Sequence, residues 1–184
     1  MASRQSEGSN LVDQTSAIKE AIDKETDMEM NRYLTEIFNF NDQMNKKVLE
    51  KIKQLPDKGE CIKFFSHLIN SQYKWMARIV QYPKDPKLNW WDPVYVLEDL
   101  EKEWNKSLRA WIDLIQVKNE TELFEEVKFI GFDGGSWTVK LKDIALQLNY
   151  HSIHHRAQIQ SLIRKQGLEP DFVDYIGTVY KKLS

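Results

Sequence analysis

Residues 139–166 read VKLKDIALQLNYHSIHHRAQIQSLIRKQ, and this stretch decides the fold because its apolar residues recur at the spacing of an α-helix. Thr138 is placed to cap such a helix, and Gly167 and Pro170 are placed to end it. On a helical wheel, one sector of about 80° holds Ile144, Leu148, His151, His155, Ile159 and Leu162. The sequence therefore predicts an amphipathic helix whose buried stripe carries two histidines.

Three more segments show the same helical periodicity. The first extends from about residue 13 to Leu55 and is ended by Pro56, and the second covers about residues 60–81. The third follows the pair Asp92 and Pro93, which is typical of a helix start. The apolar stripes of the first and third segments are Met30, Leu34, Ile37, Met44, Val48, Ile52 and Leu55, and Leu97, Leu100, Trp104, Leu108, Trp111 and Ile115.

The segments between these helices have different compositions. Residues 82–93 read YPKDPKLNWWDP, and their three prolines predict a crossover loop. Residues 122–139 read ELFEEVKFIGFDGGSWTV, and their short aromatic and β-branched runs around Asp133 predict a small hairpin. A short final helix is expected over residues 171–182.

Together these elements predict an all-α protein. We expect a four-helix bundle with a long crossover connection, a small hairpin-like excursion before the fourth helix and a short C-terminal helix. A chain of 184 residues is long enough for one domain with a substantial core and short for two. Residues 1–12 are polar and are expected to form a flexible tail, so the bundle domain is predicted over residues 13–184.

The composition narrows the classes of function. The 26 basic and 28 acidic residues are mixed along the chain, so no basic patch predicts nucleic-acid binding. No run of about 18 apolar residues predicts a membrane span, and the first residues do not resemble a secretory signal. The lone Cys61 cannot form an internal disulfide and is expected to be a small buried apolar residue. We therefore interpret the sequence as that of a cytoplasmic protein.

His151 and His155 lie one helical turn apart on the stripe that faces the core. A buried imidazole needs a hydrogen-bond partner or a metal ion, because burying it unpaired costs a few kcal/mol. Two histidines at this spacing can bind one ion if another helix supplies a third ligand. The alternative is that both are neutral core residues hydrogen-bonded to Asn41, Gln158 or buried water. His154 lies about 60° or more to one side and is interpreted as a bystander or as a residue that supports the ligands without binding the ion.

Other candidate residues lie outside this stripe. His67 falls just beyond the apolar arc of the second helix, so by itself it is interpreted as a solvated residue. Arg156 is expected to point away from any ion, as a surface charge or as a partner of Asp171 or Asp174. Three aromatic residues are interpreted as core more readily than as a pocket lining: Trp75, Trp104 and Trp111.

Four motifs occur in order along the chain. Residues 149–159, NYHSIHHRAQI, contain the pattern H-x-x-x-H-R-A-Q. The others are Asn41 with Asn45, His67 followed eight residues later by Trp75, and GLEPDFVDYIGTVY at residues 167–180. Together they resemble the DinB family, also called the DinB/YfiT-like superfamily, with Ala157 where the family signature has glycine.

The resemblance implies a four-helix bundle that binds a divalent ion through His67, His151 and His155. Histidine ligands suit zinc, nickel, iron and copper alike, so the pattern does not select one metal. Many family members have another histidine where this chain has Gln147, which leaves the role of that position open. The resemblance also implies a homodimer.

The expected chemistry follows from an ion held by three neutral nitrogens, which leaves positions for water or substrate. The resemblance implies a metal-dependent enzyme of the thiol S-transferase or hydrolase kind, acting on a small electrophilic substrate with a small-molecule thiol. Two alternatives stay open: a non-catalytic metal-binding stress-response protein, and a bundle whose histidines are structural. No general base stands out, and Asn41 and Gln158 are expected to orient ligands or water.

Overall fold

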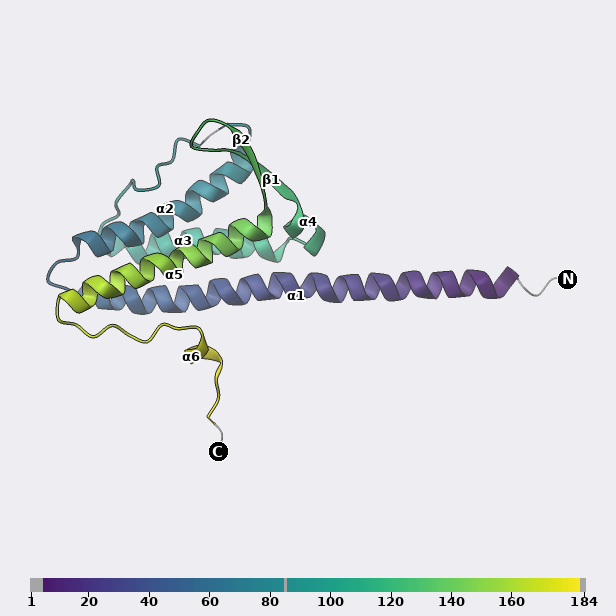
Figure 1. Ribbon diagram of the computed structural model, residues 1–184, viewed down its shortest axis with the longest axis horizontal. Coiled ribbons are helices and arrows are strands. Elements are labelled where there is room, and N and C mark those ends of the chain that lie inside the picture. Colours follow the sequence, from purple (N-terminus) through teal and green to yellow (C-terminus); the bar gives the residue numbers. More distant parts are fainter. Residues whose placement is uncertain (1–4, 85, 183–184) are drawn as a thin grey trace.

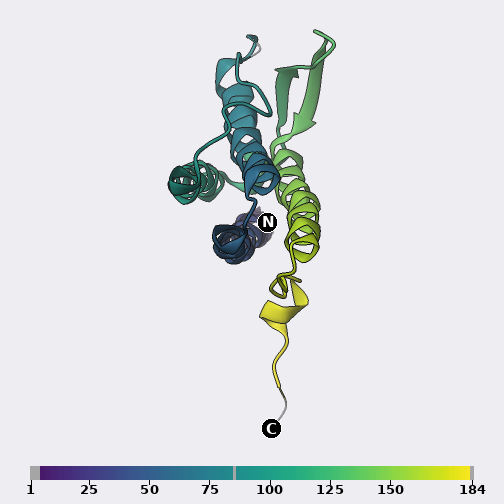
Figure 2. The same cartoon turned by 90° about the vertical axis from the view of Figure 1, so that its left-hand side faces the viewer.

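Four long helices form the body of the computed structural model, which describes residues 5–84 and 86–182, with side chains from Met30 onward. They are α1 (Gln5–Gln54), α2 (Gly59–Gln81), α3 (Leu97–Gln116) and α5 (Leu141–Lys165) (Figure 1). Helices α1 and α2 each pack against both α3 and α5 (Figure 2), so the four helices enclose one core. The predicted four-helix bundle is confirmed.

Four smaller elements complete the fold. They are α4 (Glu120–Phe124), β1 (Glu126–Ile130), β2 (Ser136–Lys140) and α6 (Ile176–Val179). The strands β1 and β2 pair antiparallel and form the hairpin predicted before the last long helix. The short C-terminal helix is present, but it covers only part of the predicted residues 171–182, because the segment before it is held without helix along α5 by a hydrogen bond from Gln160 to the Asp171 carbonyl.

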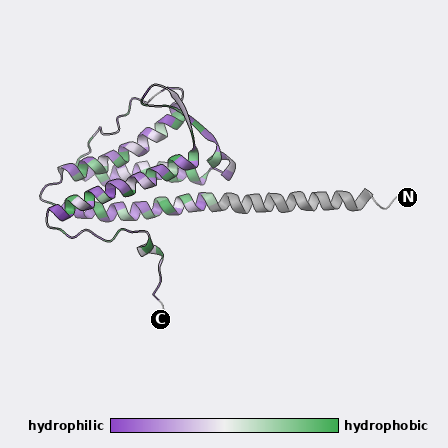
Figure 3. Cartoon of the chain, in the orientation of Figure 1, coloured by the Kyte–Doolittle hydropathy of each residue, from purple (hydrophilic) through white to green (hydrophobic). Residues whose placement is uncertain are grey.

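The core is built from the apolar stripes that the sequence predicts. Trp104 and Trp111 of α3 are fully buried, and Phe38 of α1 stacks on Trp111 with ring centroids 6.2 Å apart. Both tryptophans are therefore core residues, as interpreted. Hydrophobic and hydrophilic residues alternate along the helices (Figure 3), and none of the helices in the described part of the chain has the length and apolarity needed to cross a membrane.

Helix α1 begins earlier than the sequence predicts. It starts at Gln5, so the boundary predicted after residue 12 lies inside the helix, and residues 1–4 lie outside the described part of the chain. The flexibility of this segment stays a prediction.

The starts of α3 and α5 also differ from the prediction. Asp92 does not cap α3, because its carboxylate accepts a hydrogen bond from Asn89 within the loop, and the helix begins only at Leu97. Thr138 does not cap α5, because it belongs to β2 and pairs with Lys128. The hairpin therefore extends directly into α5.

The crossover loop, described at residues 82–84 and 86–96, is held on α2 through its own backbone carbonyls. The bonds run from His67 Nδ1 to Trp90 O (2.7 Å), from Asn70 Nδ2 to Pro93 O (3.0 Å) and from Lys74 Nζ to Pro86 O (3.1 Å). Because successive turns of α2 supply these donors, the loop has a defined path with little regular secondary structure of its own. The path brings Trp90 and Trp91 beside His67.

Candidate metal centre

Three histidines meet between α2 and α5. His67 comes from α2 and His151 and His155 come from α5, and one ring nitrogen of each lies within 4.8 Å of the others. His67 and His155 are each 6% exposed, and His151 is partly buried. The structure thus brings together the three residues that the resemblance implies as ligands, which we call the histidine cluster.

His67 is buried, which corrects the interpretation drawn from its own helix. The crossover loop covers this side of α2, so that the Trp91 indole stacks on the His67 ring with centroids 3.8 Å apart and planes 10° from parallel. The periodicity of α2 cannot reveal this, because the covering residues come from an irregular loop. The only signal in the sequence is the adjacent pair Trp90 and Trp91, two large aromatic residues in that loop.

Hydrogen bonds outside the cluster orient two of the rings. A carbonyl oxygen only accepts, so His67 donates through Nδ1 to Trp90 O, and its Nε2 keeps a lone pair. His155 Nδ1 lies 2.6 Å from Gln158 Oε1 and donates in the same way. Gln158 thus fixes the orientation of the His155 ring, and its role in orienting a metal ligand or water stays a prediction. Both neutral rings therefore expose an unprotonated Nε2.

Burial keeps the rings of the cluster neutral. Burial, with a smaller contribution from the charges that His155, His67 and His154 would carry, lowers the pKa of His151 to about 4. It likewise lowers the pKa of His155 to about 4, although the bond to Gln158 opposes the shift. Burial also lowers the pKa of His67, against the opposing effect of its bond to Trp90. Neutral imidazole is the form that binds a metal ion.

The donor set and its spacing fit a divalent transition-metal ion. His151 Nε2 lies 2.8 Å from His67 Nε2, and because His67 Nε2 carries no proton, His151 Nε2 donates to it. Nitrogens bound to one tetrahedral ion at 2.0–2.1 Å would lie about 3.3 Å apart, so this pair would have to separate by about 0.5 Å. No carboxylate belongs to the cluster within the described residues.

A second buried polar group lies on the neighbouring face of α5. Arg156 is 2% exposed and donates through Nη1 to Asn41 Oδ1 (2.7 Å) and Asn45 Oδ1 (3.2 Å). Asn45 Nδ2 in turn donates to Ser152 Oγ at 2.8 Å. These four residues form what we call the asparagine–arginine network.

This network corrects two expectations. Arg156 is not a surface charge, because α5 packs against α1 as well as α2 and buries a wider arc than its apolar stripe indicates. Burial lowers its pKa to about 10, and Asp174 raises the pKa only partly in return. Asp171 pairs instead with Lys51, 3.6 Å away. Asn41 therefore orients Arg156 and makes no hydrogen bond to a histidine of the cluster.

The structure places the remaining candidate site residues in different surroundings. His154 is exposed, and its ring centroid lies 5.0 Å from that of His155, so it stays outside the cluster. Cys61 is fully buried, and burial raises the pKa of its thiol to about 11, as suits a small apolar residue. Trp75 is only partly buried and lines a cavity, whereas Trp104 and Trp111 are core.

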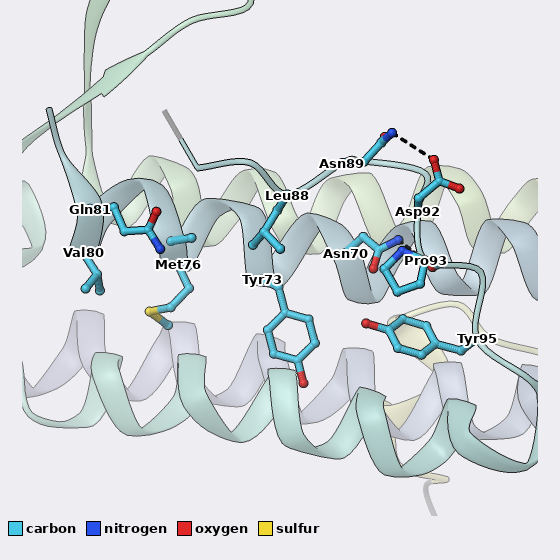
Figure 4. Close-up of a pocket in the computed structure, with 11 residues that line it drawn as sticks. Asn70, Tyr73, Met76, Val80, Gln81, Leu88, Asn89, Asp92, Pro93 and Tyr95 are labelled. Carbon is cyan, nitrogen blue, oxygen red and sulfur yellow. Dashed lines mark hydrogen bonds between the residues drawn. The ribbon is translucent and has the colours of Figure 1, made fainter. Parts of the chain in front are cut away.

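That cavity adjoins the histidine cluster. It has a volume of about 310 Å³, and His67 and His151 form part of its lining together with Ser71, Trp75, Trp90, Gln147 and Leu148. A second cavity, of about 370 Å³, lies on the other flank of the crossover loop (Figure 4). It is lined by residues such as Tyr73, Leu88 and Tyr95 and by no histidine. Of these two cavities, the first is the one that can bring a ligand to the cluster.

The fold and the cluster define a class: a helical bundle with a buried three-histidine site that could bind a metal ion. A family model described as DinB family matches residues 28–182, a span that contains all three histidines, so the chain belongs to the DinB family. No curated protein matches the sequence significantly. The resemblance seen in the four sequence motifs is thereby confirmed.

Proposed function

We propose that the protein binds a divalent transition-metal ion, such as zinc, nickel or iron, through His67, His151 and His155, and that it is a metal-dependent enzyme of the thiol S-transferase kind. The observation that carries the proposal is the convergence of three neutral imidazoles beside a cavity for a small molecule. Such an ion supplies positive charge that stabilises a thiolate or lowers the pKa of bound water.

The protein's own residues supply orientation and shielding. Trp90 O accepts a hydrogen bond from Nδ1 of His67, and Gln158 Oε1 accepts one from Nδ1 of His155. Both rings are thereby held in the tautomer that leaves Nε2 available to an ion. Trp91 covers one face of the His67 ring and limits the access of water from that side. The cavity leaves the other approach open to a substrate of limited size.

Thiol transfer is favoured over hydrolysis by the lack of a well-placed general base. No carboxylate lies in the cluster among the described residues, and His154 is exposed to one side. A thiol, with a pKa of about 8.5, loses its proton near neutrality more readily than water does. Hydrolysis is therefore the second candidate reaction. The same lack of a base favours the non-catalytic metal-binding protein as the alternative function.

Metal binding is tested with protein purified without a histidine tag. We expect about one equivalent of zinc or cobalt per chain by elemental analysis and titration, and a loss of affinity of about 100-fold or more in His67→Ala and His151→Ala. His154→Ala is the matched control and should bind as the unchanged protein does. If no metal binds, or if the three variants behave alike, the histidines are structural and the proposal fails.

Catalysis is tested by a screen of small electrophiles with several low-molecular-weight thiols. Thiol consumption that stops when a chelator removes the metal would support the transferase. Product formed without thiol, but still dependent on the metal, would support the hydrolase. Metal-loaded protein that turns over none of the pairs would favour the non-catalytic alternative. The homodimer, the stress-response role and the cytoplasmic location stay predictions.

A further inference from the structure

The cavity beside the histidine cluster has an aromatic wall made from two parts of the chain. Trp75 comes from α2 and Trp90 from the crossover loop, with ring centroids 6.2 Å apart and planes inclined by 64°. Leu148 of α5 adds an apolar surface. The hydroxyl of Ser71, also in the lining, donates to the carbonyl of His67 in its own helix. The wall is thus mainly two indole rings that flank two of the histidines.

The positions of these two indole rings are restricted by neighbouring side chains. The Arg78 guanidinium lies 4.9 Å from the Trp75 ring centroid and 5.0 Å from that of Trp90. Phe129 of the hairpin packs against Trp75 with centroids 5.2 Å apart. Because both rings already have neighbours that restrict their rotamers, a ligand that stacks on them orders little of the protein.

The charges around the wall indicate the kind of ligand. Among the described residues, those that line the cavity include no carboxylate that would attract a cation. Lys74 lies over the Trp90 ring at 5.5 Å, in addition to Arg78. An indole whose quadrupole already faces a cation is a weaker partner for a second one. The wall therefore suits a neutral or anionic ligand.

We infer that this cavity selects small thiols with a flat aromatic group, which stacks on one of the two indoles, Trp75 or Trp90, and packs edge-on against the other, while the sulfur reaches the ion at the histidine cluster. The inference rests on the proposed metal site and names the substrate class of that site. Trp75 and Trp90 are then specificity-determining residues. Neither is needed to hold the ion, because Trp90 contributes only its backbone carbonyl to His67.

The test compares 2-phenylethanethiol with 2-cyclohexylethanethiol, two alkyl thiols of similar size whose acidities are close because two methylene groups separate the ring from the sulfur; only the first has a flat ring. Each is titrated into the cobalt-loaded protein, and the near-ultraviolet absorption of the cobalt–sulfur bond reports binding. The variants are Trp75→Leu, Trp90→Leu and, as conservative replacement, Trp75→Phe. Trp137→Leu is the matched control, because that indole is 52% exposed on β2 and does not line the cavity.

We expect the unchanged protein and Trp137→Leu to bind the aromatic thiol about fivefold more tightly than the cyclohexyl thiol. The ratio of the two thiol affinities should fall toward one in Trp75→Leu and in Trp90→Leu, while both variants keep their affinity for cobalt. Trp75→Phe should keep most of the preference for the aromatic thiol. Equal affinities in the unchanged protein, with the cobalt–sulfur absorption present, would overturn the inference and leave the metal site intact. Failure to bind cobalt at all would overturn the proposed function and this inference with it.

Discussion

Two buried polar clusters share helix α5, and they differ in where their hydrogen bonds end. In the asparagine–arginine network, donors and acceptors meet one another, and the guanidinium of Arg156 ends on two amide oxygens of α1. In the histidine cluster, the bonds to Trp90 and Gln158 lie on the outer nitrogens, and the Nε2 atoms turn inward. The network is closed by protein groups, whereas the cluster is open to a ligand.

The two clusters are built from adjacent residues. Ser152 follows His151 and Arg156 follows His155, and one step along a helix turns the side chain by about 100°. That turn separates the side facing α2 and the crossover loop from the side facing α1. Buried polar residues alone therefore do not identify a binding site. A binding site is identified by the direction in which the hydrogen-bonding atoms of these residues point.

The largest effect should come from opening the closed network. Arg156→Ala should lower the free energy of unfolding by about 3 kcal/mol, because the buried oxygen of Asn45 loses its donor and that of Asn41 keeps only the long bond, 3.5 Å, from Asn45 Nδ2. Urea denaturation in the presence of chelator measures this. Arg109→Ala, whose side chain is 74% exposed, is the control and should cost less than about 0.5 kcal/mol. If Arg156→Ala weakened metal binding more than folding, the two clusters would not be separate.

Filling the open cluster should stabilise the fold by a comparable amount. Zinc at about 100 times its Kd should raise the free energy of unfolding by about 2.7 kcal/mol, because the unfolded chain has no assembled site. The shift in the urea midpoint measures the gain. His151→Ala should show almost none of it. A gain of the same size in that variant would mean that zinc acts elsewhere.

A smaller effect is expected from loosening one ring of the cluster. Gln158→Leu removes the acceptor of His155 Nδ1 and should weaken metal affinity by about tenfold, with little change in stability. Isothermal titration with zinc measures it. Gln160→Leu lies on the same helix but loses only a bond to the Asp171 carbonyl, so its affinity should be unchanged. Equal losses in both variants would argue against an orienting role for Gln158.

The smallest effect concerns Cys61, a buried ionisable group that belongs to neither cluster. Burial raises the pKa of its thiol to about 11, and the charges of Asp57 and Glu60 add to the shift. The folded state thus disfavours the thiolate, so stability is complete below pH 9 and is lost as the pH rises toward 11. From pH 8 to 10 the unchanged protein should lose about 1 kcal/mol more than Cys61→Ala. Parallel denaturation series at the two pH values would show this, and identical slopes would contradict it.

Most of the fold could be predicted from the sequence, because the apolar stripes of α1, α3 and α5 repeat at helical spacing over several turns. The same phase identified His151 and His155 as core-facing residues. The prediction of His67 as a site residue needed the family resemblance, because the chain segment that buries it lies some 23 residues away in an irregular loop. The periodicity of a helix shows which of its own residues form an apolar face, and it does not show which distant segment covers the other residues.

Arg156 shows a different limit of sequence reasoning. A charged residue beside an apolar stripe is usually solvated, and the sequence does not show that α5 packs against two helices at once. The clue in the sequence was Asn41, which occupies an apolar position of the α1 stripe. A buried amide at this position needs a polar partner, but a single sequence does not show which residue that partner is.

The anchoring of the crossover loop has a consequence for how this site could be altered. The donors from α2 bind backbone carbonyls, which every residue type provides, so these three hydrogen bonds do not depend on which side chains the loop carries. An engineer could exchange the residue at position 90 and keep the bond that orients His67. Substrate preference and metal affinity would then be adjustable separately, with the loop as the exchangeable part.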